Sequence, residues 1–136
     1  MKFDTKIAVA LREDLPTWQK LNMTAFMVSG IAGTDPSTVG EDYADASGNA
    51  YLPMFRQPVL VFSATGEELR AAYERAMRRG VKMAIFTEEL FATGHDEANR
   101  AAVAAVASGD LKLVGIAMRA ERNVVDKVLK GLALHG

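Results

Sequence analysis

Cysteine is absent from this chain of 136 residues. Disulfide bonds, thiolate metal sites and cysteine nucleophiles are therefore excluded together. The sequence also lacks an apolar run of about 18 residues, the length that a transmembrane helix needs, so we expect no membrane partner. Residues 1–6 do not contain the apolar core of a signal peptide, because Asp4 stands where that core would begin. We therefore expect a cytoplasmic protein.

The sequence also has no excess of positive or negative charge. Lys and Arg together number 16 and Asp and Glu number 17, which leaves a net charge of −1. The two signs are interspersed along the chain, so the basic patch that nucleic acid requires does not form, and we expect no nucleic-acid partner. Histidine occurs only as His95 and His135, and His95 adjoins Asp96 instead of a ligand four residues away. We expect neither a metal nor a cofactor.

The composition is otherwise that of a globular protein, with 49% hydrophobic and 24% charged residues, and the length indicates a single domain over residues 1–136. Four short apolar runs predict buried strands, and amphipathic segments between them predict helices. The runs lie near residues 6–11, 58–63, 81–86 and 111–117. A small hairpin is predicted at 41–53, around Ser47-Gly48-Asn49. The pattern predicts a three-layer α/β domain with helices on both faces of one sheet.

The first predicted helix runs from Pro16 to about Ala32 and is apolar on two sides. One stripe is expected to face the core, and it consists of Trp18, Leu21, Ala25, Val28 and Ala32. Met23, Met27 and Ile31 lie on the other side, where few polar residues would cover them. A second apolar face on one small domain favours a homodimer through this helix, or docking of another protein partner.

Residues 86–100 hold the densest group of candidate site residues, between a predicted strand and a predicted helix. Thr93 is expected to cap that helix, which places His95 and Asp96 in its first turn beside free N–H groups that favour an anion. Glu88 directly follows the strand. These residues can equally be a helix cap and a solvated acid with no further role.

Asn99 and Asn22 lie on helix faces that are otherwise apolar, and a buried amide needs hydrogen-bond partners. Strand ends and helix starts at one edge of an α/β sheet are where ligands collect. We therefore expect Asn22, Thr93, His95 and Asn99 to converge on one pocket for a small polar or anionic ligand. The competing interpretation is that each amide bridges neighbouring backbone.

Several segments together resemble one bacterial family, known as domain of unknown function two thousand. They are Trp18-Gln19-Lys20-Leu21-Asn22, Gln57-Pro58-Val59-Leu60-Val61-Phe62, Thr87 to Asp96, and Asn99-Arg100. The family is similar in fold to type II peptidyl-tRNA hydrolase, which implies a four-stranded mixed sheet between helices. Arg12-Glu13-Asp14-Leu15 resembles a segment after the first strand of that enzyme.

The catalytic pattern of the hydrolase is not reproduced. Its lysine–glycine-rich motif, glutamine and histidine are replaced here by residues 16–21 and by Ala25 and Val28, and only Glu88 matches its aspartate. An altered hydrolase could still use Glu88 or His95 as base and Lys20 to stabilise charge. Three hypotheses therefore remain open: a binding module, an altered hydrolase and a protein-interaction module.

Overall fold

The structure, a computed structural model, describes residues 3–136 of the chain. Over these residues one mixed sheet has five strands in the order β5-β6-β1-β4-β7. The strands are β1 (Thr5–Arg12), β4 (Val59–Ala64), β5 (Met83–Thr87), β6 (Leu113–Glu121) and β7 (Ala133–Leu134). β1 pairs with β4 in parallel, and the other three pairings are antiparallel. The prediction that the four apolar runs form one sheet is confirmed, but the expected number of four strands is wrong.

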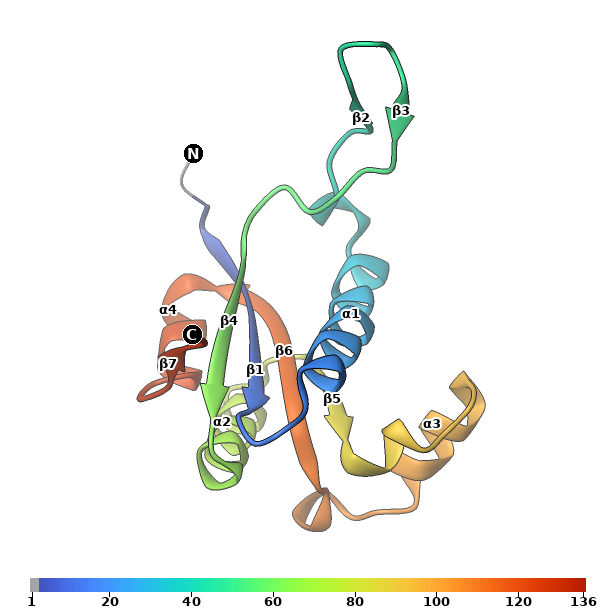
Figure 1. The fold of residues 1–136 in the computed structure, drawn as a ribbon. Helices are drawn as coiled ribbons and strands as arrows, with labels where there is room; N and C mark the ends of the chain where they lie inside the picture. The colour runs from blue at the N-terminus through green and yellow to red at the C-terminus, as the bar shows by residue number, and fades with distance from the viewer. Residues whose placement is uncertain (1–2) are drawn as a thin grey trace.

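Helices cover both faces of this sheet and make three layers (Figure 1). The helices of residues 3–136 are α1 (Thr17–Thr34), α2 (Gly66–Arg78), α3 (Asp96–Ala104) and α4 (Arg122–Val128), with 3-10 turns η1 (Pro36–Thr38), η2 (Glu88–Phe91) and η3 (Ser108–Asp110). α1 packs on β5 and β6 from one side, while α2 and α4 pack from the other. No helix of this part of the chain is both long and apolar enough to cross a membrane.

The face of α1 that packs against the core is the opposite of the one predicted. Met23 and Met27 are buried against β6, whereas Leu21 and Trp18 are exposed. The reason lies on β6, where Gly115 has no side chain and Met27 Cε would come within 2.8 Å of an added Cβ. Long methionine side chains fill the space that the glycine leaves. The prediction of a methionine-faced dimer contact is therefore wrong for these residues.

The last helix is shorter than predicted because β6 continues to Glu121, where it pairs with Thr5 of β1. The helix expected from about Arg119 to Leu132 therefore spans only Arg122–Val128. The chain then turns at Gly131 and adds β7 beside β4, with Leu134 opposite Phe62. This pairing supplies the fifth strand.

The predicted hairpin forms a separate two-stranded sheet of β2 (Tyr43–Ala44) and β3 (Ala50–Tyr51). It rises from the top of the molecule, clear of the three layers (Figure 1). We call residues 39–55 the arm, because an isolated bridge between Val39 and Phe55 closes its base. The arm joins the end of α1, through η1, to the start of β4.

Candidate functional site

A cavity of about 460 Å³ lies between α1 and the segment that links β5 to α3. Its walls come from three stretches of the chain: Trp18, Asn22 and Phe26 of α1, then Phe86, Leu90 and Phe91, then Thr93, Gly94, His95, Asp96 and Asn99. The three α1 residues are four apart in sequence, a spacing that places them along one side of a helix. The cavity thus occupies the strand-to-helix junction after β5.

Asn22, Thr93, His95 and Asn99 all line this one cavity. The structure therefore brings the four predicted residues together in space. The predicted burial of Asn22 is nevertheless wrong, because this residue is exposed. Asn99 is half-buried, as its position on the inner side of α3 predicts.

Aromatic rings form the apolar wall of the cavity. The rings of Phe86 and Phe91 are 5.0 Å apart between centroids, Trp18 lies 6.0 Å from Phe91, and Phe26 lies 6.0 Å from Phe86. Edge-to-face and tilted contacts of this kind hold rings in fixed orientations. This wall was not predicted, because the helical spacing placed Trp18 in the core, although the four-residue spacing from Trp18 to Asn22 to Phe26 was a usable signal.

Thr93 and Asn99 form the polar floor. The Thr93 hydroxyl contacts the Leu90 carbonyl oxygen at 3.0 Å and also the Asn99 side-chain oxygen. A hydroxyl carries one proton and can donate to only one of these two oxygens. Turning the Asn99 amide over satisfies both contacts: its N–H then donates to Thr93, the Thr93 hydroxyl donates to Leu90, and the Asn99 oxygen is left to accept a hydrogen bond within the cavity.

His95, and not Thr93, caps α3. Its Nδ1 accepts a hydrogen bond of 3.3 Å from the backbone N–H of Ala98, so the expected Thr93 cap is wrong. A neutral imidazole whose Nδ1 accepts must carry its proton on Nε2. His95 therefore offers the cavity an N–H donor. It serves as a base only if the cap is broken.

The electrostatics of the cavity do not favour an anion. Among its lining residues in the described chain there is no Lys or Arg, and Asp96 adds a carboxylate that pairs with Arg100 one turn along α3. The first turn of α3 already contains Asp96 and Glu97, which complement the positive end of the helix dipole.

The other catalytic candidates lie elsewhere. Glu88 accepts a hydrogen bond of 2.7 Å from Arg12 Nη1, and Arg12 Nε also reaches Asp14 at 2.6 Å. The hydrogen bond to Glu88 raises the pKa of Arg12, and that from Arg12 lowers the pKa of Asp14. Lys20 Nζ lies 3.1 Å from Nε2 of His135. Within residues 3–136, neither Lys20 nor Glu88 lines the cavity around His95.

In the same part of the chain, no three His, Asp or Glu side chains are grouped in a way that could hold a metal ion. The features of the cavity are instead aromatic rings, two carboxamides, a hydroxyl and an imidazole N–H.

These features define a three-layer α/β protein with an aromatic cavity beside the end of β5. The chain belongs to the family described as "Protein of unknown function (DUF2000)", whose model matches residues 5–136. It is similar to the solved structure of a protein of unknown function from Agrobacterium tumefaciens strain C58, with 47% identity, a TM-score of 0.96, and coverage of 99% of this chain and 100% of that chain. No curated protein matches the chain. The family expected from the sequence motifs is confirmed.

Proposed function

We propose that this protein binds a small uncharged ligand that has a planar apolar body and a carboxamide-like polar group. The observation that carries the proposal is the convergence of Asn22, His95 and Asn99 on a cavity walled by aromatic rings. Its volume of about 460 Å³ lies within the usual range for small-molecule sites.

The wall and the floor select different parts of such a ligand. A planar ring packs against Trp18, Phe86 and Phe91 by offset or edge contacts. A carboxamide both donates and accepts hydrogen bonds, and the floor supplies both partners: the His95 N–H donates, and the free oxygen of Asn99 accepts. A polar group that only accepts hydrogen bonds would leave the Asn99 oxygen without a donor, which would cost about 1–3 kcal/mol of binding free energy.

The same floor disfavours the anionic ligand that the sequence also predicted. An anion would sit beside Asp96 with no Lys or Arg among the lining residues described here. We therefore retain the small polar ligand and set the anion aside as the weaker alternative.

Binding is favoured over hydrolysis because the three candidate catalytic residues serve other contacts. Glu88 is paired with Arg12, Lys20 lies against His135, and His95 Nδ1 caps α3. A general base must reach the proton it abstracts directly or through one water. None of the three contacts places a free base beside a second reacting group.

A similarity in fold to type II peptidyl-tRNA hydrolase remains part of the proposal. Four of the five strands lie side by side as β5-β6-β1-β4, in a mixed sheet between helices. This arrangement supports the four-stranded mixed sheet that the motifs imply, and β7 is an addition at its edge. Similarity of fold does not transfer activity.

The fluorescence of Trp18 tests ligand binding directly, because it is the single tryptophan of the chain and lines the cavity. Benzamide and benzoate have the same size and shape and differ in charge. We expect benzamide to change the emission saturably, with a Kd on the order of millimolar for so small a ligand. Benzoate at the same concentrations should have little effect.

Asn99→Ala should weaken benzamide binding about tenfold, because the ligand loses its hydrogen-bond partner at the half-buried Asn99. Asn123→Ala is the matched control, since Asn123 is exposed on α4. A linear response to benzamide, or a saturable response that Asn99→Ala leaves intact, would contradict the proposal. Stronger binding of benzoate would restore the anionic alternative.

A further inference from the structure

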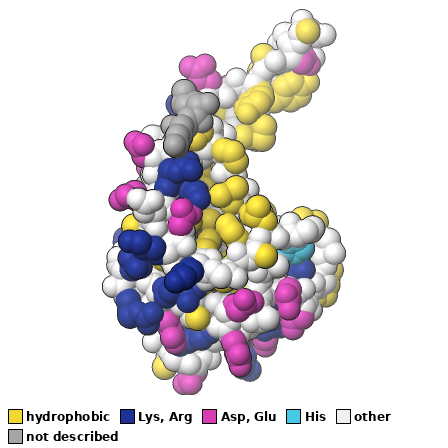
Figure 2. Space-filling view, turned by 90° about the vertical axis from the view of Figure 1, so that its left-hand side faces the viewer, with side chains coloured by type: hydrophobic (Ala, Val, Ile, Leu, Met, Phe, Trp, Pro, Cys, Tyr) yellow, Lys and Arg dark blue, Asp and Glu magenta, His cyan; other side chains and the backbone are white. Residues whose placement is uncertain are grey.

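The arm exposes an apolar surface that no other part of residues 3–136 covers. Its large apolar side chains are exposed by 49% for Tyr43, 54% for Tyr51, 83% for Leu52 and 58% for Met54. Figure 2 shows such side chains along the arm and in the hollow below it. With about 200 Å² as the surface of a large side chain, these four leave about 500 Å² of apolar surface on each arm. A surface of this size on a projecting element indicates a binding partner.

The tip of the arm is held rigid although it is surrounded by solvent. Asp45 accepts hydrogen bonds from the backbone N–H groups of Ser47 and Asn49, at 2.9 and 3.0 Å, and from the Tyr51 hydroxyl at 2.7 Å. These bonds lower the pKa of Asp45 to about 2, with the Tyr51 hydroxyl as the largest cause. Gly48 completes the turn with a φ of +87°, which suits glycine.

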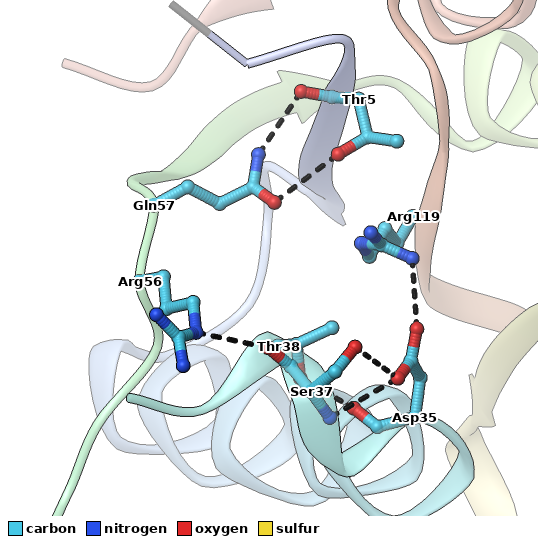
Figure 3. Close-up of polar contacts among 7 residues, drawn as sticks. All are labelled: Thr5, Asp35, Ser37, Thr38, Arg56, Gln57 and Arg119. Atoms are coloured by element: carbon cyan, nitrogen blue, oxygen red, sulfur yellow. Dashed lines mark hydrogen bonds and ion pairs between the residues drawn. The ribbon is translucent and has the colours of Figure 1, made fainter. Parts of the chain in front are cut away.

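The root of the arm is tied to the body by polar contacts from three elements (Figure 3). The Gln57 amide exchanges two hydrogen bonds with Thr5 of β1, at 3.0 and 3.2 Å. Asp35 accepts a hydrogen bond of 2.5 Å from the Ser37 hydroxyl and pairs with Arg119 of β6 at 3.2 Å. An arm fixed at both ends loses little conformational entropy when it binds a partner.

A second apolar surface lies on the body, beside β4. α1 packs on β5 and β6, so it leaves the neighbouring face of β4 partly open. Val59 and Val61 are half-buried on that side of the sheet, and Val28 of α1 is half-buried next to the same cluster. Leu21 lies two turns before Val28 on α1 and is exposed by 68%. We call this surface the β4 hollow; Figure 2 shows hydrophobic side chains in a depression under the arm.

We infer that the chain forms a two-fold symmetric dimer in which the arm of each copy lies in the β4 hollow of the other. The root of the arm joins the end of α1 to the start of β4, which are the two walls of the hollow. When two hollows face each other across a two-fold axis, each arm therefore extends over the partner copy. This inference goes beyond the ligand proposal, and Leu52 and Leu21 do not line the aromatic cavity.

The available area is sufficient for a stable dimer. Two arms would bury about 1,000 Å² and an equal area of the hollows, which gives about 2,000 Å² in total, at the upper end of standard interfaces. Charge favours the same contact. Residues 39–55 contain three acids and no basic residue. The hollow has a positive charge at its edge from Lys20, which lies beside His135. The backbone N–H of His135 in turn donates to the carbonyl oxygen of Val61, a residue of the hollow.

Sedimentation velocity at micromolar concentration provides the first test. We expect a dimer, and Leu52→Asp should raise its dissociation constant by about 100-fold or more, because two copies of the leucine are lost from each interface. Met77→Asp is the matched control on exposed surface of α2, and it should remain dimeric. Leu52 makes no core contact, so circular dichroism should show Leu52→Asp folded; Leu52→Ser provides a milder second variant.

Cross-linking identifies the surface that receives the arm, and the absence of cysteine makes single-cysteine variants clean probes. Leu52→Cys and Leu21→Cys, mixed and treated with a short bis-maleimide, should give a cross-linked dimer that neither variant gives alone. Leu134→Cys is the control, because Leu134 is exposed beside Phe62 on the opposite face of the sheet.

Three results would overturn the inference. They are a monomeric wild-type protein at this concentration, a dimer that Leu52→Asp leaves unchanged, and cross-linking of Leu52→Cys to itself or to Leu134→Cys in place of Leu21→Cys. Benzamide binding does not bear on any of them, so the two proposals stand or fall separately.

Discussion

The contact between α1 and the sheet predicts a favourable coupling between substitutions at Met27 and Gly115. Met27 is 2% exposed, and its Cε lies 2.8 Å from the position that a Cβ on Gly115 would occupy. Met27→Ala should lower the free energy of unfolding by about 4 kcal/mol, because Gly115 has no side chain to fill the void. This value lies in the upper half of the range for buried methionine. Gly115→Ala alone adds a methyl group that overlaps the Met27 side chain, at about 1–3 kcal/mol. Replacing glycine within a strand recovers about 0.5–1 kcal/mol of this cost.

In the double variant the new methyl group enters the space that Met27 has left. The overlap disappears and part of the void is filled, so the double variant should be about 1–2 kcal/mol more stable than the sum of the single effects predicts. Met77→Ala provides a matched control, since Met77 is 55% exposed on α2. It should cost less than about 1 kcal/mol, because methionine and alanine have similar helix propensities.

Urea denaturation followed by far-UV circular dichroism measures all four variants, at one protein concentration so that association affects them equally. The coupling must exceed about 0.5 kcal/mol to stand above ordinary additivity. Additive effects, or a Met27→Ala cost as small as that of Met77→Ala, would refute the reasoning. Either result would mean that the Met27 side chain does not fill the space above Gly115.

Two further predictions concern the arm and the hydrolase resemblance. Asp45 has a pKa of about 2 in the fold against an ordinary value of 3.8. The hydrogen bonds to ionised Asp45 therefore stabilise the arm tip fully above pH 3.8, and this stabilisation is lost as the pH falls through about 2. Hydrogen exchange at Ser47 and Asn49, normalised for its intrinsic pH dependence, should lose protection in that window, and Asp45→Asn should remove the pH dependence. Labelled peptidyl-tRNA should not be hydrolysed, because Ala25 and Val28 stand near the glutamine and histidine positions of the hydrolase pattern; turnover at the rate of a true hydrolase would show otherwise.

Local patterns predicted the strands well, because each is a short apolar run between charged residues or turns. β1 is an example, with Ile7 to Leu11 all buried. The orientation of α1 could not be predicted in this way. The helix carries Lys20 as its single charged residue, so both sides have similar hydrophobicity. Gly115 decides between them from a distant strand. β7 is two residues long and carries no periodic signal.

The candidate cavity was predictable in its polar half only. Thr93, His95 and Asn99 lie within seven residues of one another, and a polar group at a strand-to-helix junction is a local signal. Their individual roles were not predictable, since either Thr93 or His95 could cap α3 and only the backbone geometry chooses His95. The aromatic wall brings Trp18 to Phe91, a contact between segments that are distant in sequence.

The position of β1 in the sheet has a consequence for how the chain folds. β1 is made first, yet it is the central strand, and Val9 pairs with Val61 on one side and with Ala117 on the other. Its second neighbour is therefore synthesised only near the end of translation. Until then one edge of this apolar strand stays unpaired, and closing so long a loop slows folding. A nascent chain halted before β6 should accordingly bind chaperones and aggregate, whereas one that includes β6 can complete its core.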